Sequence, residues 1–305
     1  MSLKKIFYKF TNTKKYKEYK NSLNNQKKIN FLKSGFESEI SNIQEKIRTK
    51  KDLSFLHSGH LGDIINALPV IKELAKTHKC KFYIQPKKPL PEKTSGYKHS
   101  KDYVFMTDKM VNMVLPLLKN QEYIHKVDKY NGGEIDIDLD LFRKIPMNFN
   151  LDEVRWYFQL TGVQTDLSKP YLDAEPSKKI QNKVVIMRST RRKNIFINYN
   201  FLSKYKDLLF LGIQEEYEDL KKEVPHLEFH DCKDFLETAE IIKAGKFFLG
   251  NSSFGFTIAE GLKVPRLMES YPDFPMIYPN GNHGYDFYFQ DHLEKWFDFL
   301  YNLKN

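Results

Sequence analysis

The sequence predicts an α/β protein built from two doubly wound domains that face each other across a cleft, behind a basic helical leader. From Asp52 onward, short apolar segments alternate with helical patterns, and strands separated by helices form parallel sheets covered on both faces. Polar residues follow several of the strands, at the carboxyl ends where such sheets bind ligands. The excess positive charge, in contrast, lies entirely in residues 1–51.

Composition indicates an ordinary globular protein of 305 residues, enough for one large domain or two of average size. No stretch approaches the roughly 18 apolar residues of a membrane span, and the N-terminus lacks a signal-peptide core, so neither export nor a span is expected. Cys80 and Cys232 are far apart, without the spacing of metal ligands. This favours reduced thiols in a cytoplasmic protein. Neither a bound metal nor a cofactor is expected.

The leader, residues 1–51, carries 14 Lys and Arg against four Asp and Glu, which accounts for the whole formal net charge of +10. Apolar residues interrupt the lysines, as in an amphipathic helix lying on anionic lipid, where each Lys contributes about 1 kcal/mol. Such a helix places the protein at the inner face of the cytoplasmic membrane. A solvated arm fits the same composition, and both interpretations stay open. No nucleic-acid partner is expected, because neither zinc-ligand spacing nor an aromatic-basic strand accompanies the charge.

The first domain, 52–150, begins with a strand and a sharp polar corner. The strand Leu53–Ser58 leads through Gly59–Asp63 into a helix whose apolar residues follow the 3.6-residue period. The carboxylate of Asp63 and the imidazole of His60 both lie at this corner. They are the candidate acid-base residues of the first domain.

The rest of the first domain is expected as a strand, a loop, a helix and a strand: Lys81–Gln85, Pro86–Ser100, Met110–Leu118 and Glu134–Phe142. The loop is rich in Pro, Lys and Gly, and such loops often cover a site. Asp136 and Asp138 in the last strand resemble a metal-binding Asp-x-Asp motif. Strict alternation, however, places Asp136, Asp138 and Asp140 on one face, as the polar side of an edge strand.

The second domain, 151–280, begins with a helix, Leu151–Val163, that joins the two halves. It then alternates strands and helices: strand Lys183–Ser189, helix Tyr199–Tyr205, strand Leu208–Gly212, helix Glu215–Val224, strand Leu227–Asp231, helix Lys233–Ala244, strand Lys246–Gly250 and a helix after Ser253. Residues 281–305 end in an aromatic helix, His292–Leu303. Its apolar stripe is expected to pack back on the body.

Three strand ends of the second domain are candidates for binding a phosphorylated ligand. The first carries Arg188, Ser189, Thr190, Arg191 and Lys193, whose cations can form charge-assisted bonds to a diphosphate. The second carries Gln214, Glu215 and Glu216, where a carboxylate can bind ribose hydroxyls or, alternatively, favour the helix dipole. The third carries Asn251, Ser252, Ser253, Phe254 and Gly255, a helix start that suits a phosphate.

At these corners the chain resembles the heptosyltransferases, glycosyltransferase family 9. HLGDIINALPVIKEL resembles the family's first strand-helix corner, MRSTRRKNI its Thr/Lys donor-phosphate segment, LGIQEEYEDL its Gly-x-x-x-Glu segment, and GNSSFGFTIAEGLKVP its nucleotide-binding segment. Order and spacing match from about residue 53 to 268. The resemblance implies two Rossmann-like domains of the B-type glycosyltransferase fold, with the acceptor domain first and the nucleotide-sugar domain second, and no obligatory metal.

Carried over to this chain, the resemblance makes Asp63 the catalytic base, with His60 in reserve. It makes Thr190 and Lys193 donor-phosphate ligands, and Glu216 or Glu215 the ribose or adenosine contact. Asn251 stands where the family has Asp, and Phe256 stands where it has His. These departures leave the donor open.

The function that follows is an inverting, metal-independent glycosyltransferase. It moves a sugar, with heptose as one candidate, from a nucleotide-diphospho-sugar to a surface-glycan or lipid-linked acceptor, as in lipopolysaccharide biosynthesis. Two alternatives stay open. One is a fucosyltransferase-like or epimerase-like B-type enzyme that uses a GDP- or UDP-sugar. The other is a nucleotide-binding scaffold protein without turnover.

Overall fold

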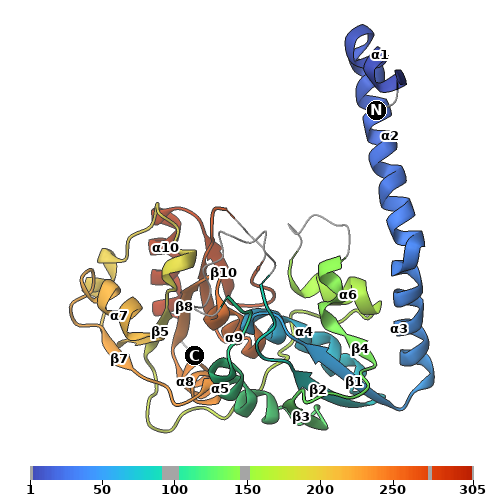
Figure 1. Cartoon of the computed structure of the whole chain (residues 1–305). Coiled ribbons are helices and arrows are strands. Elements are labelled where there is room, and N and C mark those ends of the chain that lie inside the picture. The colour runs from blue at the N-terminus through green and yellow to red at the C-terminus, as the bar shows by residue number, and fades with distance from the viewer. Residues whose placement is uncertain (1–2, 91–102, 145–151, 274–276, 304–305) are drawn as a thin grey trace.

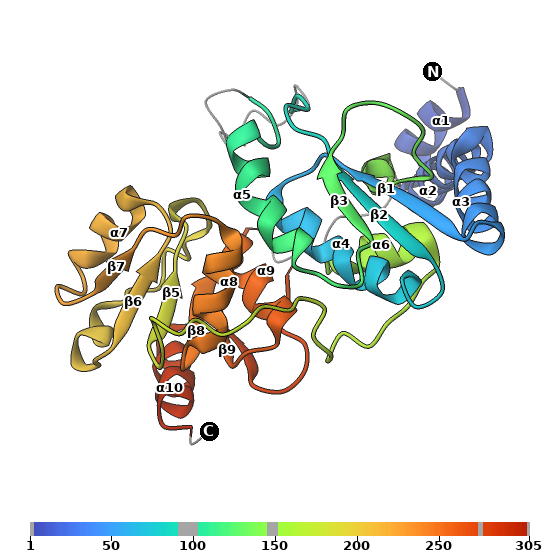
Figure 2. The ribbon, with the colours of Figure 1, turned by 90° about the horizontal axis from the view of Figure 1, so that it is seen from below.

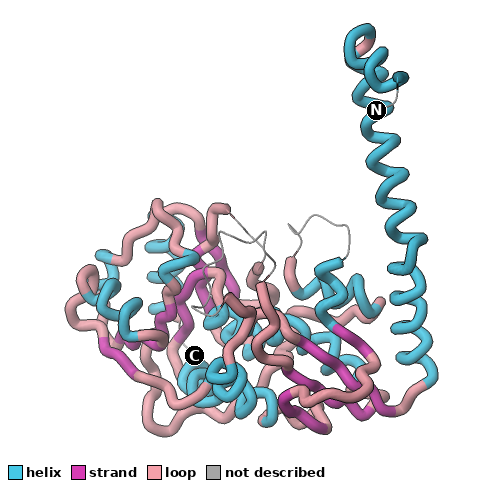
Figure 3. Tube along the Cα trace, viewed as in Figure 1, coloured by secondary structure: helices cyan, strands magenta, loops and turns pink. Residues whose placement is uncertain are grey.

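The computed structural model describes residues 3–90, 103–144, 152–273 and 277–303, and it contains two parallel sheets, their helices and a long helical arm (Figure 1). The predicted α/β fold class is confirmed. Figure 3 shows that the arm is helical throughout most of its length, whereas the strands gather in the two sheets. No helix of the described chain is both long enough and apolar enough to cross a bilayer.

The arm comprises α1 (Leu3–Thr11), α2 (Thr13–Phe31), η1 (Leu32–Phe36) and α3 (Glu37–Thr49). Gly35, at a φ of 136°, interrupts helical geometry within η1, which is a conformation that favours glycine. Among the described residues of the arm, only α3 has a buried side chain: Ile43 lies in the core, and Lys46 donates a hydrogen bond to the backbone oxygen of Asp136 at 2.9 Å. The last part of the basic leader is therefore packed on the first domain, while α1 and α2 extend away from it (Figure 1).

The first sheet has the strand order β3-β2-β1-β4, and every pair is parallel. Its strands are β1 (Asp52–His57), β2 (Lys79–Ile84), β3 (Lys126–Lys129) and β4 (Ile137–Asp138), and its helices are α4 (Leu61–Leu74) and α5 (Asp108–Lys119). Alternate residues of β1 and β2, such as Leu53 and Phe82, join α4 and α5 in one apolar core. The expected loop at 86–100 lies outside the described residues beyond residue 90.

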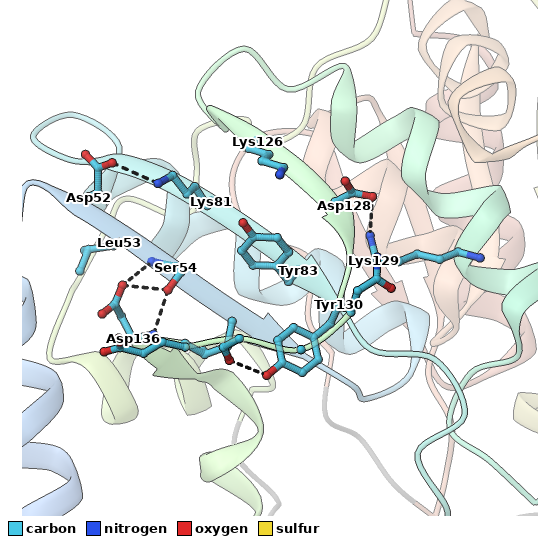
Figure 4. A pocket seen from close by; sticks show the side chains of 15 residues that line it. Asp52, Leu53, Ser54, Lys81, Tyr83, Lys126, Asp128, Lys129, Tyr130 and Asp136 are labelled. Atoms are coloured by element: carbon cyan, nitrogen blue, oxygen red, sulfur yellow. Dashed lines mark hydrogen bonds and ion pairs between the residues drawn. The ribbon is translucent and has the colours of Figure 1, made fainter.

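The opposite face of this sheet carries a polar hollow of about 420 Å³. Figure 4 shows Ser54, Lys81, Tyr83 and Asp128 on this face, together with Asp136 at the sheet edge. Asp136 accepts hydrogen bonds from the backbone N–H of Ser54 at 2.9 Å and from its hydroxyl at 2.8 Å. The Asp136 carboxylate thus holds β1 at Ser54. In the described chain, side chains rather than a helix cover this face of the first sheet.

The predicted strand Glu134–Phe142 is wrong over most of its length. Only Ile137–Asp138 pairs with β1, and the chain then turns into the 3-10 helix η2 (Leu139–Lys144). The cause is Asp140, which is buried and accepts a hydrogen bond from the backbone N–H of Ser58 at 2.8 Å. Because this carboxylate turns inward to hold the loop after β1, Asp140 does not share a solvent face with Asp136.

The second sheet has the order β10-β9-β8-β5-β6-β7, again parallel throughout. Its strands are β5 (Val184–Met187), β6 (Leu208–Leu211), β7 (Glu228–His230), β8 (Phe247–Asn251), β9 (Arg266–Glu269) and β10 (Gly284–Phe287), and its helical segments are η3 (Thr190–Arg192), η4 (Asn200–Lys204), α7 (Gln214–Lys221), α8 (Phe235–Ala244), α9 (Phe254–Leu262) and α10 (Gln290–Tyr301). The helix expected at Tyr199–Tyr205 is a short 3-10 turn. The strands β3, β9 and β10 were not predicted.

The helix α6 (Val154–Thr161) lies elsewhere than the sequence suggests, whereas the C-terminal helix α10 packs on the body as expected. α6 packs against α3, α4 and η2 of the first domain, so the connection to the second sheet runs through the segment 162–183. α10 buries Leu293, Phe297 and Leu300 against the second sheet. The aromatic stripe at the C-terminal end of the chain thus belongs to the core of the second domain.

The two domains meet through their helices, with α4 beside α9 and α5 beside α8 (Figure 2). Phe256 of α9 is fully buried, and it joins the same apolar cluster as Ile64 and Leu68 of α4. The cluster that begins under the first sheet therefore continues into the second domain. This packing positions the start of α4 close to α9, since a side-chain carbon at Gly62 would lie 3.7 Å from the Thr257 methyl group.

Candidate functional site

The corner between β1 and α4 is unusually tight. A Cβ atom on Gly59 would overlap the side-chain ends of Arg143, Asp63 and His57, so these three groups pack directly against a residue without a side chain. The Gly59 N–H donates to His57 Nδ1 at 3.0 Å, and the buried His57 also contacts the hydroxyl of Tyr157 at 2.8 Å. That hydroxyl donates to the backbone oxygen of Asp63 at 2.9 Å. The contacts of His57 and Tyr157 therefore fix the backbone conformation of this corner.

Asp63 lies in the first turn of α4, where its carboxylate is buried and fully engaged. It accepts the backbone N–H of His60 at 3.0 Å and forms an ion pair with Arg143. Burial raises the pKa of Asp63, but the Arg143 charge and a hydrogen bond with Glu153 outweigh it and hold that pKa well below its usual range. Asp63 is thus ionised at all ordinary pH values, and Arg143 is its main partner.

Glu153 is the counterpart of Asp63 in this cluster. It is buried just before α6, and both burial and the Asp63 charge raise its pKa well above the ordinary value for glutamate. The pKa values of the two neighbouring carboxyl groups are therefore shifted in opposite directions, which favours the ionised form of Asp63 and the protonated form of Glu153. Neither Arg143 nor Glu153 was predicted from the sequence, since no local pattern marks residues that lie so far from Asp63 along the chain.

His60 precedes α4 and faces the junction of the domains. Its ring stacks edge-on against Phe105, with Nδ1 at 3.3 Å from the Phe105 backbone oxygen. Burial lowers the pKa of His60, and the charges of Arg143 and Arg191 lower it further. The imidazole is therefore neutral at pH 7.

In the second domain, Arg188 is turned into the core. Its guanidinium pairs with Glu269 through contacts of 2.8 and 3.2 Å, donates to the backbone oxygen of Ile197 at 3.0 Å, and lies over the Tyr199 ring. Glu269 is fully buried. Arg188 thus ties the end of β5 to β9 and leaves the surface of this corner to the residues that follow it.

Asn251 joins two of the predicted corners. Its side-chain oxygen accepts the Ser189 N–H at 3.1 Å, and its amide nitrogen donates to the Ser189 backbone oxygen at 2.7 Å. An amide can do both, whereas an ionised aspartate can only accept. The chemistry of this bridge explains why Asn stands here.

The remaining polar residues meet around η3 and α7. Glu216 accepts the Thr190 N–H at 3.0 Å, and burial raises its pKa. Lys193 forms an ion pair with Asp219 of α7. Gln214 and Glu215, in contrast, are exposed at the start of α7, where Gln214 donates to Glu218 at 2.6 Å. The structure therefore brings Glu216 to the corner and leaves Gln214 and Glu215 outside it.

The start of α9 completes the site. Ser253 is the N-cap residue, and Phe254 and Gly255 form the first turn. Gly255 lets this turn approach β5, since a Cβ there would meet the Met187 sulfur at 2.5 Å. The Ser252 hydroxyl is buried and has no hydrogen-bond partner within the described chain. An unpartnered hydroxyl beside a helix N-terminus is a suitable place for an anionic oxygen.

Two α/β domains joined with their polar strand ends at a common junction have the architecture of B-type glycosyltransferases. Solved structures share it. A glycosyl transferase of family 9 from Veillonella parvula DSM 2008 matches with 12% identity and a TM-score of 0.53, covering 84% of this chain and 91% of its own. E. coli heptosyltransferase WaaC with ADP matches with 10% identity and a TM-score of 0.55, covering 82% and 99%.

The same E. coli heptosyltransferase WaaC with ADP-2-deoxy-2-fluoro heptose matches with 9% identity and a TM-score of 0.53, over 81% of this chain and 99% of its own. No protein-family model matches the sequence, and no curated protein does either. At such low identities the likeness establishes the common fold. It agrees with the family resemblance seen in the four corner motifs.

The carboxyl pair gives a pH-dependent prediction. Folded Glu153 keeps a proton that the unfolded chain releases above pH 4.5, so its contribution to stability falls as pH rises from 4.5 toward the raised folded pKa. Glu153→Gln removes this loss. We expect its free energy of unfolding, relative to wild type, to increase with pH by up to about 1.4 kcal/mol per pH unit.

Urea unfolding between about pH 4 and 8 measures the effect. Glu122→Gln, at an exposed glutamate, is the matched control and should follow wild type at every pH. A parallel pH dependence of Glu153→Gln and wild type would show that Glu153 ionises normally.

Proposed function

We propose that this chain is an inverting glycosyltransferase, which transfers a sugar from a nucleotide-diphospho-sugar to a glycan or lipid-linked acceptor. The observation that carries the proposal is the junction itself. One corner offers a carboxylate and a neutral imidazole, and the facing corner offers cations, backbone N–H groups and an unpartnered hydroxyl. An inverting transfer needs these two sets, a base at the acceptor and positive groups at the departing diphosphate.

The donor side is formed by η3 and the start of α9. Arg191 and Lys193 supply positive charge, and the helix dipole of α9 adds to it near Ser252 and Ser253. Glu216 stands beside them, where a ribose hydroxyl can donate to it. The neighbouring fold binds ADP and an ADP-heptose analogue in WaaC, which supports an adenine nucleotide as the first donor to test.

The acceptor side is formed by Asp63 and His60. We assign Asp63 as the base that accepts the proton of the acceptor hydroxyl, with Arg143 keeping it ionised. To do this the carboxylate must exchange part of its contact with Arg143 for the hydroxyl. His60 is the second candidate, because its neutral ring can accept a proton and its Nδ1 is held by the Phe105 carbonyl. The assignment requires no metal in the transfer step.

The arm supports a lipid-linked acceptor. α1 exposes Leu3, Phe7 and Phe10, with exposed fractions of 85, 62 and 80%, among lysines of the same helix. Such a helix can insert its aromatic side into anionic lipid while the lysines bind the headgroups. The proposed location is therefore the cytoplasmic side of a membrane, with the catalytic body held near it by the arm.

The donor assignment predicts that Lys193→Ala weakens binding of the nucleotide sugar by roughly 10- to 100-fold, the value of one charge-assisted bond to phosphate. Lys222→Ala is the matched control, because Lys222 contacts the same Asp219 carboxylate but is exposed at the C-terminal end of α7. Titration of ADP-, GDP-, UDP- and CMP-sugars by calorimetry identifies the donor and measures the loss. Equal affinities of the two variants would remove Lys193 from the site.

The base assignment predicts that Asp63→Asn lowers transfer by about 10²- to 10⁴-fold, with donor affinity nearly unchanged. Retained donor binding also shows that the variant is folded. His60→Gln is measured beside it, and the larger loss identifies the base. Wild-type protein that binds a nucleotide sugar but neither transfers nor hydrolyses it would favour the scaffold alternative.

The arm predicts salt-sensitive membrane binding. Full-length protein should sediment with vesicles that contain phosphatidylserine, and a chain that begins at Glu37, which keeps the anchored α3, should not. Phe7→Ser with Phe10→Ser keeps the charge and should weaken binding at least about tenfold. Raising NaCl should release the full-length protein. Equal sedimentation of the full-length and shortened chains would leave the arm without a role in membrane binding.

A further inference from the structure

Three side chains with metal-ligand chemistry converge where β7 leads into α8. β7 ends at His230, and Asp234 caps α8 by accepting the backbone N–H of Glu237 at 2.9 Å. This turn brings one ligand atom each of His230, Cys232 and Glu237 within 4.8 Å of one another. His230 Nε2 and Glu237 Oε1 are 3.1 Å apart.

Helix capping explains only part of this cluster. The second oxygen of Glu237 accepts the backbone N–H of Lys233 at 2.7 Å, which together with the Asp234 cap fixes the start of α8. That bond does not require a histidine or a thiol. Nevertheless, the oxygen that is not used for capping faces His230, and Cys232 lies beside both.

We propose that His230, Cys232 and Glu237 bind one Zn²⁺ ion, with water as the fourth ligand. Imidazole nitrogen, thiolate sulfur and carboxylate oxygen are the ligand types of zinc in proteins. A neutral imidazole, a thiolate and a carboxylate together carry two negative charges, which match a divalent cation. The thiol proton goes to solvent as the metal–sulfur bond forms.

The charges of the turn favour a cation. The carboxylates of Asp231, Asp234 and Glu237 all belong to this short segment, and they attract a positive ion. Tetrahedral bonds of about 2.0–2.3 Å place ligand atoms roughly 3.3–3.8 Å apart, which small side-chain movements within this cluster can reach. His230 and Glu237 remain partly exposed, which gives the ion a way in.

The ion would hold the turn that sets α8 against α9. Phe235, the first residue of α8, packs edge-on against Phe254, the first residue of α9, with ring centres 4.5 Å apart. A fixed β7–α8 turn therefore steadies the helix start beside Ser252 and Ser253. The role is structural, it takes no part in the transfer step, and the zinc site does not rest on the proposed function.

Zinc titration of the full-length, chelator-treated protein against a chromophoric competitor tests the site. We expect one equivalent per chain, and a loss of at least tenfold in affinity for Cys232→Ser and His230→Gln. Glu237→Gln is the discriminating variant, because its amide oxygen can still cap Lys233 but carries no charge. It should also bind zinc at least tenfold more weakly. Cys80→Ser, at the cysteine in the first sheet, is the control and should bind like wild type.

Cobalt gives a readout that does not depend on the variants being stable. Co²⁺ should produce a thiolate charge-transfer absorption in wild type and in Cys80→Ser, and none in Cys232→Ser. Zinc should also raise the melting temperature of wild type but not of Cys232→Ser. Wild type that shows no saturable zinc binding, or a Cys80→Ser protein that loses the cobalt band, overturns the proposal.

Discussion

The guanidinium of Arg143 holds the first-domain corner together, because it lies between carboxylates from two different segments. It pairs with Asp63 in the first turn of α4 and with Asp140 of η2 at 3.3 Å. Asp140 in turn accepts the backbone N–H of Ser58. Removing Arg143 would leave the buried Asp63 and Asp140 carboxylates without this partner, which is destabilising. The conformation of the β1–α4 loop, and with it the place of His60, therefore depends on this cation together with the contacts of His57 and Tyr157.

The second domain uses the same principle at its own strand ends. Arg188 and Glu269 form a buried pair that ties β5 to β9, and the Asn251 amide joins the end of β8 to Ser189. Side chains thus hold each loop from beneath, while its backbone faces the junction of the domains. A site built this way has its N–H groups in place before a ligand arrives, which is the condition for effective stabilisation of developing charge.

The sequence predicts those parts of the fold whose signal is local. β5, β6 and β8 are continuous apolar runs between helical patterns, and they were recognisable for that reason. β9 was missed because it begins with Arg266, whose burial depends on a partner in α9, Glu260. The strand predicted at Glu134–Phe142 failed for the same kind of reason. Its alternating pattern is correct locally, but Asp140 has a partner in the loop after β1, and no local pattern contains that information.

In the candidate site, too, only the features with a local signal could be predicted. The corners could be located, since polar residues after apolar strands are visible in a single sequence. Their internal partners could not: Arg143 and Glu153 reach Asp63 only through the packing of η2 and α6 on α4. The two departures from the family pattern follow from packing as well. Asn251 can bridge both polar groups of Ser189, and Phe256 fills the apolar junction between the domains. Both side chains therefore hold the protein together. The groups that remain near these corners for a ligand are the cations of η3, the buried Ser252 hydroxyl and the backbone N–H groups at the start of α9.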